Sequence, residues 1–229
     1  MKKFIVVAGN IGSGKTTLTR YLSTHLGIAP SYESVDGNPY LADFYQDMHR
    51  WSFPLQIYFL GKRFESHRQI MEGSESVIQD RSVYEDRAIF AENLFRTGIM
   101  TDRDYQNYSQ IYEIMSHHFQ APNLVIYLKA SLSTLKRRIA KRGRDYEASI
   151  PEEYLIQLND LYDEWIGNWT LSPVVTLPAD ELDFVSSSLD FCTIFDLVQD
   201  ALDRPRQASP EGSALLADER GLDAAAVSP

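Results

Sequence analysis

The sequence contains a single cysteine, Cys192, among its 229 residues. One cysteine excludes an internal disulfide framework, and no cysteine and histidine spacing in the chain is typical of a zinc site. Because Cys192 lies in an apolar segment, we expect its thiol to be buried and inert.

Positive charge is scarce as well. The chain has 22 lysine and arginine residues against 32 aspartate and glutamate residues, which gives a net charge of −10. Binding to a phosphate backbone requires a basic surface, so we expect no nucleic-acid partner. The same charge gives no reason to expect attraction to an anionic membrane, and no apolar run approaches the ~20 residues of a membrane span. We therefore expect a cytoplasmic protein without a membrane partner.

The chain does contain a phosphate-binding motif near its start. Residues 9–16 fit the pattern G-x-x-x-x-G-K-[ST] and follow the apolar run at residues 4–8. In such a loop the backbone N–H groups cradle a polyphosphate, the lysine reaches the outer phosphates, and the hydroxyl holds Mg²⁺. Helix-forming residues follow at once, so a helix N-terminus faces the anion. We expect these residues to bind a nucleoside triphosphate: Gly9, Asn10, Ile11, Gly12, Ser13, Gly14, Lys15, Thr16 and Thr17.

Short β-branched runs alternate with longer amphipathic ones along the chain. The predicted strands are residues 4–8, 32–35, 76–80, 124–129 and 173–177. The predicted helices are residues 16–25, 38–48, 53–71, 83–97, 102–119, 133–142, 151–169 and 187–202. This alternation predicts an α/β fold of the P-loop NTPase type, with helices on both faces of a five-stranded parallel sheet and ligands at the carboxyl ends of the strands. We expect one domain over residues 1–203 and a disordered tail over residues 204–229, where proline, alanine, serine and glycine dominate.

Carboxylates and arginines follow the predicted strands at the ligand edge of the sheet. Glu33, near the end of the second predicted strand, is either a general base or a solvated strand end. Asp80 is typical of an acid that orients Mg²⁺, and Arg81 can neutralise charge on a transferring phosphoryl group, with an ion pair between them as the alternative. Arg142 and Arg144 flank Gly143 in a connection between two predicted helices. This pattern predicts a lid that clamps phosphates, or else a basic helix C-terminus that complements the helix dipole.

Three further stretches resemble the deoxyribonucleoside kinase family, and most closely its bacterial deoxyadenosine kinase branch. These are DGNPYL at residues 36–41, RWSFPLQIYFL at residues 50–60 and QDRSVYED at residues 79–86. Together with Glu33 and the phosphate-binding motif they occur in the expected order, and the similarity extends from residue 4 to about residue 202. The resemblance implies an ATP- and Mg²⁺-dependent kinase of nucleotide salvage. Its acceptor would be the 5′-hydroxyl group of a deoxyribonucleoside: deoxyadenosine first, with deoxyguanosine or deoxycytidine still open.

The resemblance also implies roles for individual residues. Glu33 would be the base, Arg81 and Lys15 would act on the transferring phosphoryl group, and Thr16 and Asp80 would lie near Mg²⁺. The acceptor would contact five further side chains: Tyr45, Gln56, Arg63, Asp86 and Glu153. The donor would contact four residues outside the phosphate-binding loop: Arg142, Arg144, Asp183 and Phe184. The family is commonly dimeric, so a homodimer joined roughly through residues 83–119 is expected.

Two functions are alternatives to a nucleoside kinase: a nucleoside monophosphate kinase and a regulatory NTP-binding protein. A nucleoside monophosphate kinase of the thymidylate type binds an acceptor with about two negative charges and requires an arginine clamp for it. The expected pocket instead sets Glu33, Asp86 and Glu153 against Arg63 and Arg81, which favours a neutral acceptor. A carboxylate base also suits an alcohol that must lose a proton. A regulatory NTP-binding protein would lack catalytic positions, and none is missing here.

Overall fold

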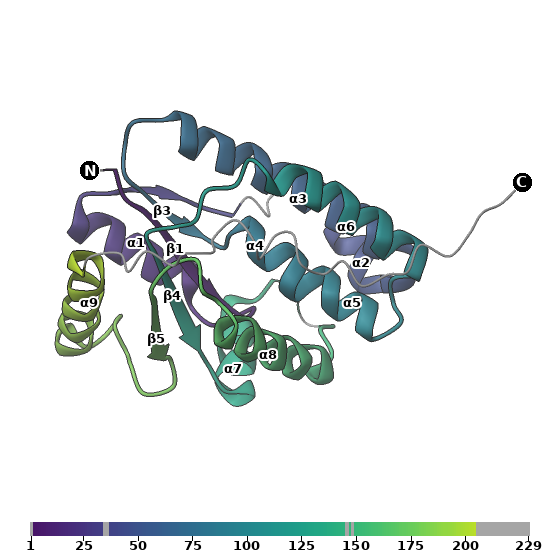
Figure 1. Cartoon of the computed structure of the whole chain (residues 1–229). Coiled ribbons are helices and arrows are strands. Elements are labelled where there is room, and N and C mark those ends of the chain that lie inside the picture. Colours follow the sequence, from purple (N-terminus) through teal and green to yellow (C-terminus); the bar gives the residue numbers. More distant parts are fainter. Residues whose placement is uncertain (1, 34–36, 145–146, 148, 205–229) are drawn as a thin grey trace, which may run out of the picture.

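The computed structural model describes residues 2–33, 37–144, 147 and 149–204. All five strands run parallel in one sheet of order β2-β3-β1-β4-β5 (Figure 1). They are β1 (Phe4–Gly9), β2 (Ala29–Ser31), β3 (Val77–Asp80), β4 (Leu124–Lys129) and β5 (Val174–Pro178). The predicted five-stranded parallel sheet is therefore confirmed. Of the predicted tail, residues 205–229 lie outside the described residues, so its disorder stays a prediction.

Helices cover both faces of the sheet. They are α1 (Lys15–Leu26), α2 (Leu41–Gln46), α3 (Met48–Glu72), α4 (Val83–Glu85), the π-helix η1 (Asp86–Ala91), α5 (Glu92–Arg96), α6 (Asp102–Ser116), α7 (Leu132–Arg142), α8 (Glu152–Gly167) and α9 (Ser188–Asp203). One apolar core joins α1, α7 and α9 to one face, and a second joins α3, η1, α5 and α8 to the other. This confirms the three-layer α/β/α arrangement. No helix in the described ranges is long and apolar enough to cross a membrane.

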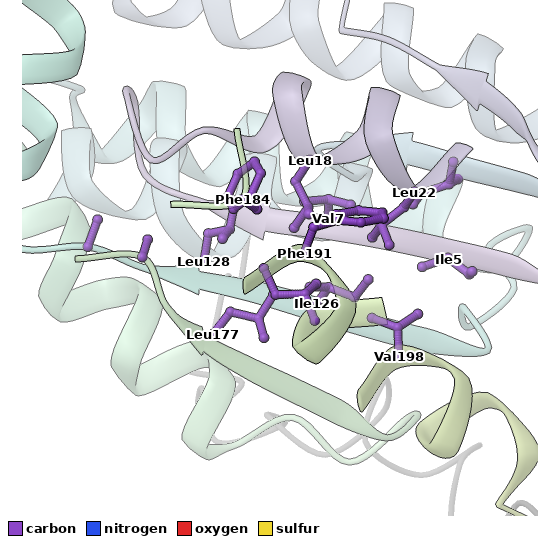
Figure 2. Close-up of a cluster of buried hydrophobic side chains, with 14 of the residues drawn as sticks. Ile5, Val7, Leu18, Leu22, Ile126, Leu128, Leu177, Phe184, Phe191 and Val198 are labelled. Carbon is purple, nitrogen blue, oxygen red and sulfur yellow. The ribbon is translucent and has the colours of Figure 1, made fainter. Parts of the chain in front are cut away.

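The central strand β1 is buried at all six of its residues. Ile5 and Val7 belong to one core and the alternate residues to the other, because successive side chains of a strand point to opposite faces. Figure 2 shows Val7 between Leu18 of α1 and Phe191 of α9. Each fully buried leucine or valine contributes about 1.5–3 kcal/mol to folding. The loop that follows β1 therefore starts from a strand that is buried on both faces of the sheet.

The prediction for the second strand was wrong. Residues 32–35 were expected to form it, but β2 is Ala29–Ser31, and only Tyr32 and Glu33 of the predicted strand are among the described residues. Ser31 pairs with Gln79, one residue before β3 ends. A strand at residues 32–35 would extend past the end of its only neighbour. Glu33 consequently lies two residues beyond the edge of the sheet, in the chain that leaves it.

Two helix predictions and the burial of the cysteine also need correction. The helix α3 begins at Met48 rather than at residue 53, because the side chain of Asp47 caps it by accepting from the N–H of Arg50 at 3.1 Å. The single helix predicted over residues 83–97 consists of α4, η1 and α5 in succession. Cys192 is exposed, because α9 turns Phe191 and its helical neighbours toward the core instead.

Candidate functional site

The predicted phosphate-binding loop leaves the carboxyl end of β1 and enters α1 at Lys15. Gly9 and Gly12 have φ angles of +148° and +84°, a region that other residues rarely adopt. A Cβ atom on Gly9 would lie 2.8 Å from the carbonyl oxygen of Leu128 in β4. The glycines therefore let the loop turn tightly against the sheet and direct the N-terminal end of α1 toward the ligand edge.

Asn10 ties this loop to α8. Its Nδ2 donates to Oδ1 of Asn159 at 2.8 Å, and its Oδ1 accepts from the N–H of Ile11 at 2.7 Å. Its carbonyl oxygen accepts from Nζ of Lys15 at 2.9 Å. Burial lowers the pKa of Lys15 to about 8, and the charge of Arg81 acts in the same direction. The lysine head is thus desolvated, and its charge acts more strongly on a bound phosphate than it would in water.

Thr16 and Asp80 form the candidate magnesium site. Oγ1 of Thr16 donates to Oδ2 of Asp80 at 2.5 Å, which joins the start of α1 to the end of β3. Oδ1 of Asp80 is buried and has no hydrogen-bond partner among the described residues. Mg²⁺ prefers oxygen ligands and commonly takes most of them from water and phosphate, so these two side chains fit the ion. Within the described residues, no three acidic, histidine or cysteine side chains group into a metal cage.

Arg63, in the middle of α3, holds two buried carboxylates together. Its Nη2 donates to Oε1 of Glu33 at 2.6 Å, and its Nε donates to Oδ1 of Asp86 at 2.5 Å. Nη1 of Arg81 lies 3.4 Å from the same oxygen of Glu33. None of the four side chains is more than 13% exposed. Two guanidinium groups therefore face two carboxyl groups in one buried network at the ligand edge of the sheet.

The two carboxylates differ in their electrostatic environment. Burial alone would raise the pKa of Glu33, but the charges of Arg81 and Arg63 outweigh it and lower the pKa to about 2. For Asp86 burial dominates, and its pKa rises to about 7 against the opposing charge of Arg63. Oδ2 of Asp86 and Oε1 of Gln56 are buried without a hydrogen-bond partner among the described residues. Glu33 is thus ionised at physiological pH, and two oxygens remain open to a ligand.

A cavity of about 300 Å³ connects this network with the phosphate-binding loop. Its walls bring together most of the residues singled out from the sequence: Ile11, Gly12, Lys15, Thr16, Glu33, Tyr45, Gln56, Arg63, Asp80, Arg81, Asp86, Arg142 and Arg144. The other predicted loop residues, which do not reach the walls, are Gly9, Asn10, Ser13, Gly14 and Thr17. Apolar side chains close the cavity: Leu41, Phe44, Leu55, Phe59 and Phe90. Apolar walls with a few convergent polar groups are typical of a small-molecule site.

Arg142 and Arg144 reach the cavity from the C-terminal end of α7. Glu147, which is 5% exposed, accepts from Nε of Arg142 at 2.9 Å and from Nη2 at 2.7 Å. Nη1 of Arg144 lies 3.4 Å from the same carboxylate. A bidentate pair of this kind fixes the plane of the guanidinium. Glu147 therefore orients the two predicted lid arginines and neutralises part of their charge.

Three predicted site residues lie away from the cavity. Glu153, in the first turn of α8, is exposed, whereas the adjacent Tyr154 is buried and lines the cavity, because a helix turns about 100° between neighbours. Asp183 is exposed, and Phe184 is buried in a core cluster. The ring of Phe184 lies 3.7 Å from the position that a Cβ atom on Gly14 would take. The segment after β5 is thus beside the phosphate-binding loop, but its contact with a donor base stays a prediction.

Sequence reasoning missed two buried carboxylates, Glu85 and Glu147. Ser82 and Glu85 form a capping box at the start of α4, and the spacing Ser-x-x-Glu could have indicated it. Glu147 follows Arg144 by three residues and is the nearest glutamate to the predicted lid, which could have marked it as the arginine partner. The aromatic walls of the cavity have no comparable signal, because buried aromatic residues are more often part of a core.

Known proteins resemble this chain in both sequence and fold. A family model described as deoxynucleoside kinase matches residues 5–203. The chain is 39% identical over 196 residues to the deoxyadenosine/deoxycytidine kinase of Bacillus subtilis, which covers 85% of this chain and 90% of that protein. It is 37% identical over 207 residues to a deoxyguanosine kinase of Lactobacillus acidophilus, with 86% and 90% covered. The solved structure of deoxyadenosine kinase from M. mycoides with bound dATP matches with a TM-score of 0.76 at 31% identity, covering 86% of this chain and 99% of that one.

Proposed function

Because the chain belongs to the deoxynucleoside kinase family, we propose that it transfers the γ-phosphate of ATP to the 5′-hydroxyl group of a deoxyribonucleoside, with deoxyadenosine the first candidate. One observation carries the proposal: Glu33 and Arg81 line the same cavity as Lys15 and Thr16 of the phosphate-binding loop. The carboxylate that accepts a proton and the loop that holds phosphates are therefore within reach of one bound acceptor.

The phosphate-binding loop and the charged side chains around it support ATP as the phosphate donor. The loop N–H groups and Lys15 would hold the β- and γ-phosphates, and Arg142 and Arg144 would add charge from the lid. Thr16 and Asp80 would hold Mg²⁺, which when bound supplies positive charge to the phosphate oxygens. The free Oδ1 of Asp80 supports this assignment, since a buried carboxylate oxygen without a partner is costly.

The carboxylate contacts of Arg63 and Arg81 support a neutral acceptor. Arg63 uses Nε and Nη2 on Asp86 and Glu33, and the nearest contact of Arg81 with a carboxylate is again with Glu33. A monophosphate acceptor would need a guanidinium free to bind it bidentately. In the described part of the cavity the cations at this end already face carboxylates, which favours a neutral nucleoside over a nucleoside monophosphate.

The chain's own residues would act on the 5′-hydroxyl group as follows. Glu33, ionised because of its low pKa, accepts a hydrogen bond from the hydroxyl and orients the oxygen toward the γ-phosphorus. A bond forms from that oxygen to phosphorus while the bond to the bridging oxygen of ADP breaks. The proton passes to Glu33, and ADP leaves with the electron pair. Arg81 and Lys15 stabilise the charge on the transferring group.

Recognition of the base is proposed for Gln56 and Asp86. Their unpaired oxygens, Oε1 and Oδ2, can accept from the amino groups of adenine, cytosine or guanine. The substrates named for the two relatives described above, deoxyadenosine, deoxycytidine and deoxyguanosine, all carry such a group. Steady-state kinetics with ATP, the four deoxynucleosides and adenosine test the proposal. We expect the highest kcat/KM for deoxyadenosine, and no turnover of any deoxynucleoside would contradict the function.

Asp86→Ala should change the ranking of deoxynucleosides. The variant removes one of the two carboxylates that bind Arg63, and this loss should lower kcat/KM for every substrate because it does not depend on the base. For the deoxynucleoside whose base pairs with Oδ2, kcat/KM should fall by a further factor of about 5–150, which corresponds to about 1–3 kcal/mol. Asp86→Asn is the matched variant, since it keeps one oxygen for Arg63 and replaces the other by an amide donor. Losses for deoxyadenosine, deoxyguanosine and deoxycytidine that equal the loss for thymidine, whose base has no amino group, would in both variants remove Asp86 from base recognition.

The acceptor contact predicted for Glu153 is better assigned to Glu147, which is buried and lines the cavity. We expect Glu147→Gln to raise the KM for the deoxynucleoside about tenfold, as for the loss of a hydrogen bond to a charged group. Glu153→Gln, a change at an exposed position, should leave it within about twofold. The two variants differ from the parent by the same chemical change, so a larger effect of Glu153→Gln would restore the original assignment.

The homodimer and the cytoplasmic location stay predictions. Ile111 and Ile114, in the stretch expected to join the subunits, are 40% and 63% exposed, which supports an interface on α6.

A further inference from the structure

Glu85 is a fully buried carboxylate that the proposed transfer does not use. Its Oε2 accepts from the N–H of Ser82 at 2.7 Å and from the hydroxyl of Ser82 at 3.2 Å. Its Oε1 accepts from the hydroxyl of Tyr162, in α8, at 2.8 Å. Glu85 is 0% exposed, and burial raises the pKa of its carboxyl against the nearby charge of Arg81. A carboxylate in such a position is costly unless each oxygen is bonded, as here.

Arg81 lies directly before the serine that Glu85 holds. Its φ angle is +65°, the left-handed region, and it is the only residue other than glycine with a positive φ among those described. An arginine in this region is disfavoured by roughly 1–2 kcal/mol and persists only where its surroundings determine it. Its N–H donates to the carbonyl oxygen of Val7 at 3.0 Å, and the next N–H, of Ser82, donates to Glu85. The backbone of Arg81 is thus held on both sides.

The held backbone sets where the guanidinium lies. Its Cζ is 4.3 Å from the ring centroid of Phe90, and Nη1 faces Glu33 at 3.4 Å. Nε of Arg81 is buried and has no hydrogen-bond partner within the described ranges. The side chain itself is therefore only weakly anchored by hydrogen bonds, and its position depends on the turn from which it starts.

We propose that Glu85, held in turn by Tyr162, is a positioning residue for Arg81, because it fixes the left-handed turn that aims the guanidinium at Glu33 and at the transferring phosphoryl group. The inference rests on the proposed function. It makes α8 a support for the reacting centre, although neither Glu85 nor Tyr162 lines the cavity.

Tyr162→Phe is the sharpest variant, because it removes one oxygen and keeps the ring. Tyr127→Phe is its matched control: the two rings stack at 5.8 Å, and the hydroxyl of Tyr127 also donates to a carboxylate of α8, Asp163, at 3.0 Å. The other partner of that carboxylate in the described ranges is Lys129, not Arg81. Glu85→Gln is the second variant, since an amide oxygen can still accept from Ser82.

We expect Tyr162→Phe to lower kcat about 10- to 100-fold, as for a misplaced catalytic group, with the KM for ATP within about twofold of the parent. Tyr127→Phe should retain the parent kcat, and the melting temperatures of the two variants should be similar. The kcat of Glu85→Gln should lie between that of the parent and that of Tyr162→Phe. A kcat for Tyr162→Phe equal to that of Tyr127→Phe would overturn the inference.

An activity-independent measurement separates this inference from the proposed function. The ¹H–¹⁵N resonance of the Arg81 Nε–H group, assigned by its absence in Arg81→Lys, should shift in Tyr162→Phe and stay in place in Tyr127→Phe. An unmoved resonance in Tyr162→Phe overturns the positioning role even if the enzyme is active. A shifted resonance in a protein that phosphorylates no deoxynucleoside would overturn the function and leave the positioning of Arg81 intact.

Discussion

Lys15→Ala is expected to abolish measurable phosphoryl transfer, a fall in kcat of at least about 10²–10³-fold. The ammonium group of Lys15 is buried and desolvated, so a cation from the surrounding solvent cannot take its place beside the phosphates. Among the described residues, its side chain donates one hydrogen bond, to the carbonyl oxygen of Asn10. The change therefore removes charge from the site while most of the packing of α1 stays.

Steady-state turnover and the melting temperature of Lys15→Ala, measured side by side, check this expectation. Lys129→Ala is a suitable control, because Lys129 is exposed and, within the part of the chain that the structure describes, pairs with Asp163 at the surface. That variant should keep the parent kcat. Turnover by a folded Lys15→Ala at more than about a tenth of the parent rate would show that the loop lysine does not act on the reacting phosphate.

Glu33→Gln is expected to lower kcat about 10²–10⁴-fold, the range for loss of a general base, while the deoxynucleoside still binds. Glutamine keeps the shape of the side chain and an oxygen near Arg63, but it cannot take up the proton of the 5′-hydroxyl group. Isothermal titration with deoxyadenosine should therefore give a Kd close to that of the parent. A kcat within about threefold of the parent would exclude Glu33 as the base.

The pH dependence adds a second check on Glu33. Its pKa is held at about 2 by Arg81 and Arg63, below the usual range of a glutamate. The carboxylate is therefore ionised at every pH above about 4, and it contributes no acidic limb to the kcat/KM profile in that range. The ratio of kcat/KM of the parent to that of Glu33→Gln should stay constant between about pH 6 and about pH 9. A ratio that rises with pH in this interval would contradict the low pKa.

The parts of the site that could be predicted from sequence are those set by local geometry. The phosphate-binding loop was found because its glycines, its lysine and its helix start are fixed by contiguous residues, and Gly9 and Gly12 do have the positive φ angles that such a loop needs. The sheet followed from the alternation of apolar strands and amphipathic helices. Strand register was not predictable in the same way, because Ser31 pairs with Gln79, which lies 48 residues further along the chain.

Contacts between distant residues were out of reach of sequence reasoning alone. Arg63 is 30 residues from Glu33 and 23 from Asp86, and no local pattern indicates that one guanidinium holds both carboxylates. The position of Glu153 outside the cavity has a rotational cause, since α8 turns Tyr154 rather than Glu153 toward the cavity. The resemblance to a family gave the residue types of the site, and the structure gave their partners.

We propose that ATP phosphorylates the 5′-hydroxyl group of a deoxynucleoside in the cavity beside Glu33. The most direct test is ³¹P NMR of the purified chain with ATP, Mg²⁺ and either deoxyadenosine or its 5′-monophosphate. With deoxyadenosine we expect a 5′-phosphomonoester signal to grow in step with ADP, and with the monophosphate we expect no diphosphate product. Release of inorganic phosphate without a phosphomonoester, or conversion of the monophosphate to a diphosphate as the faster reaction, would contradict the account.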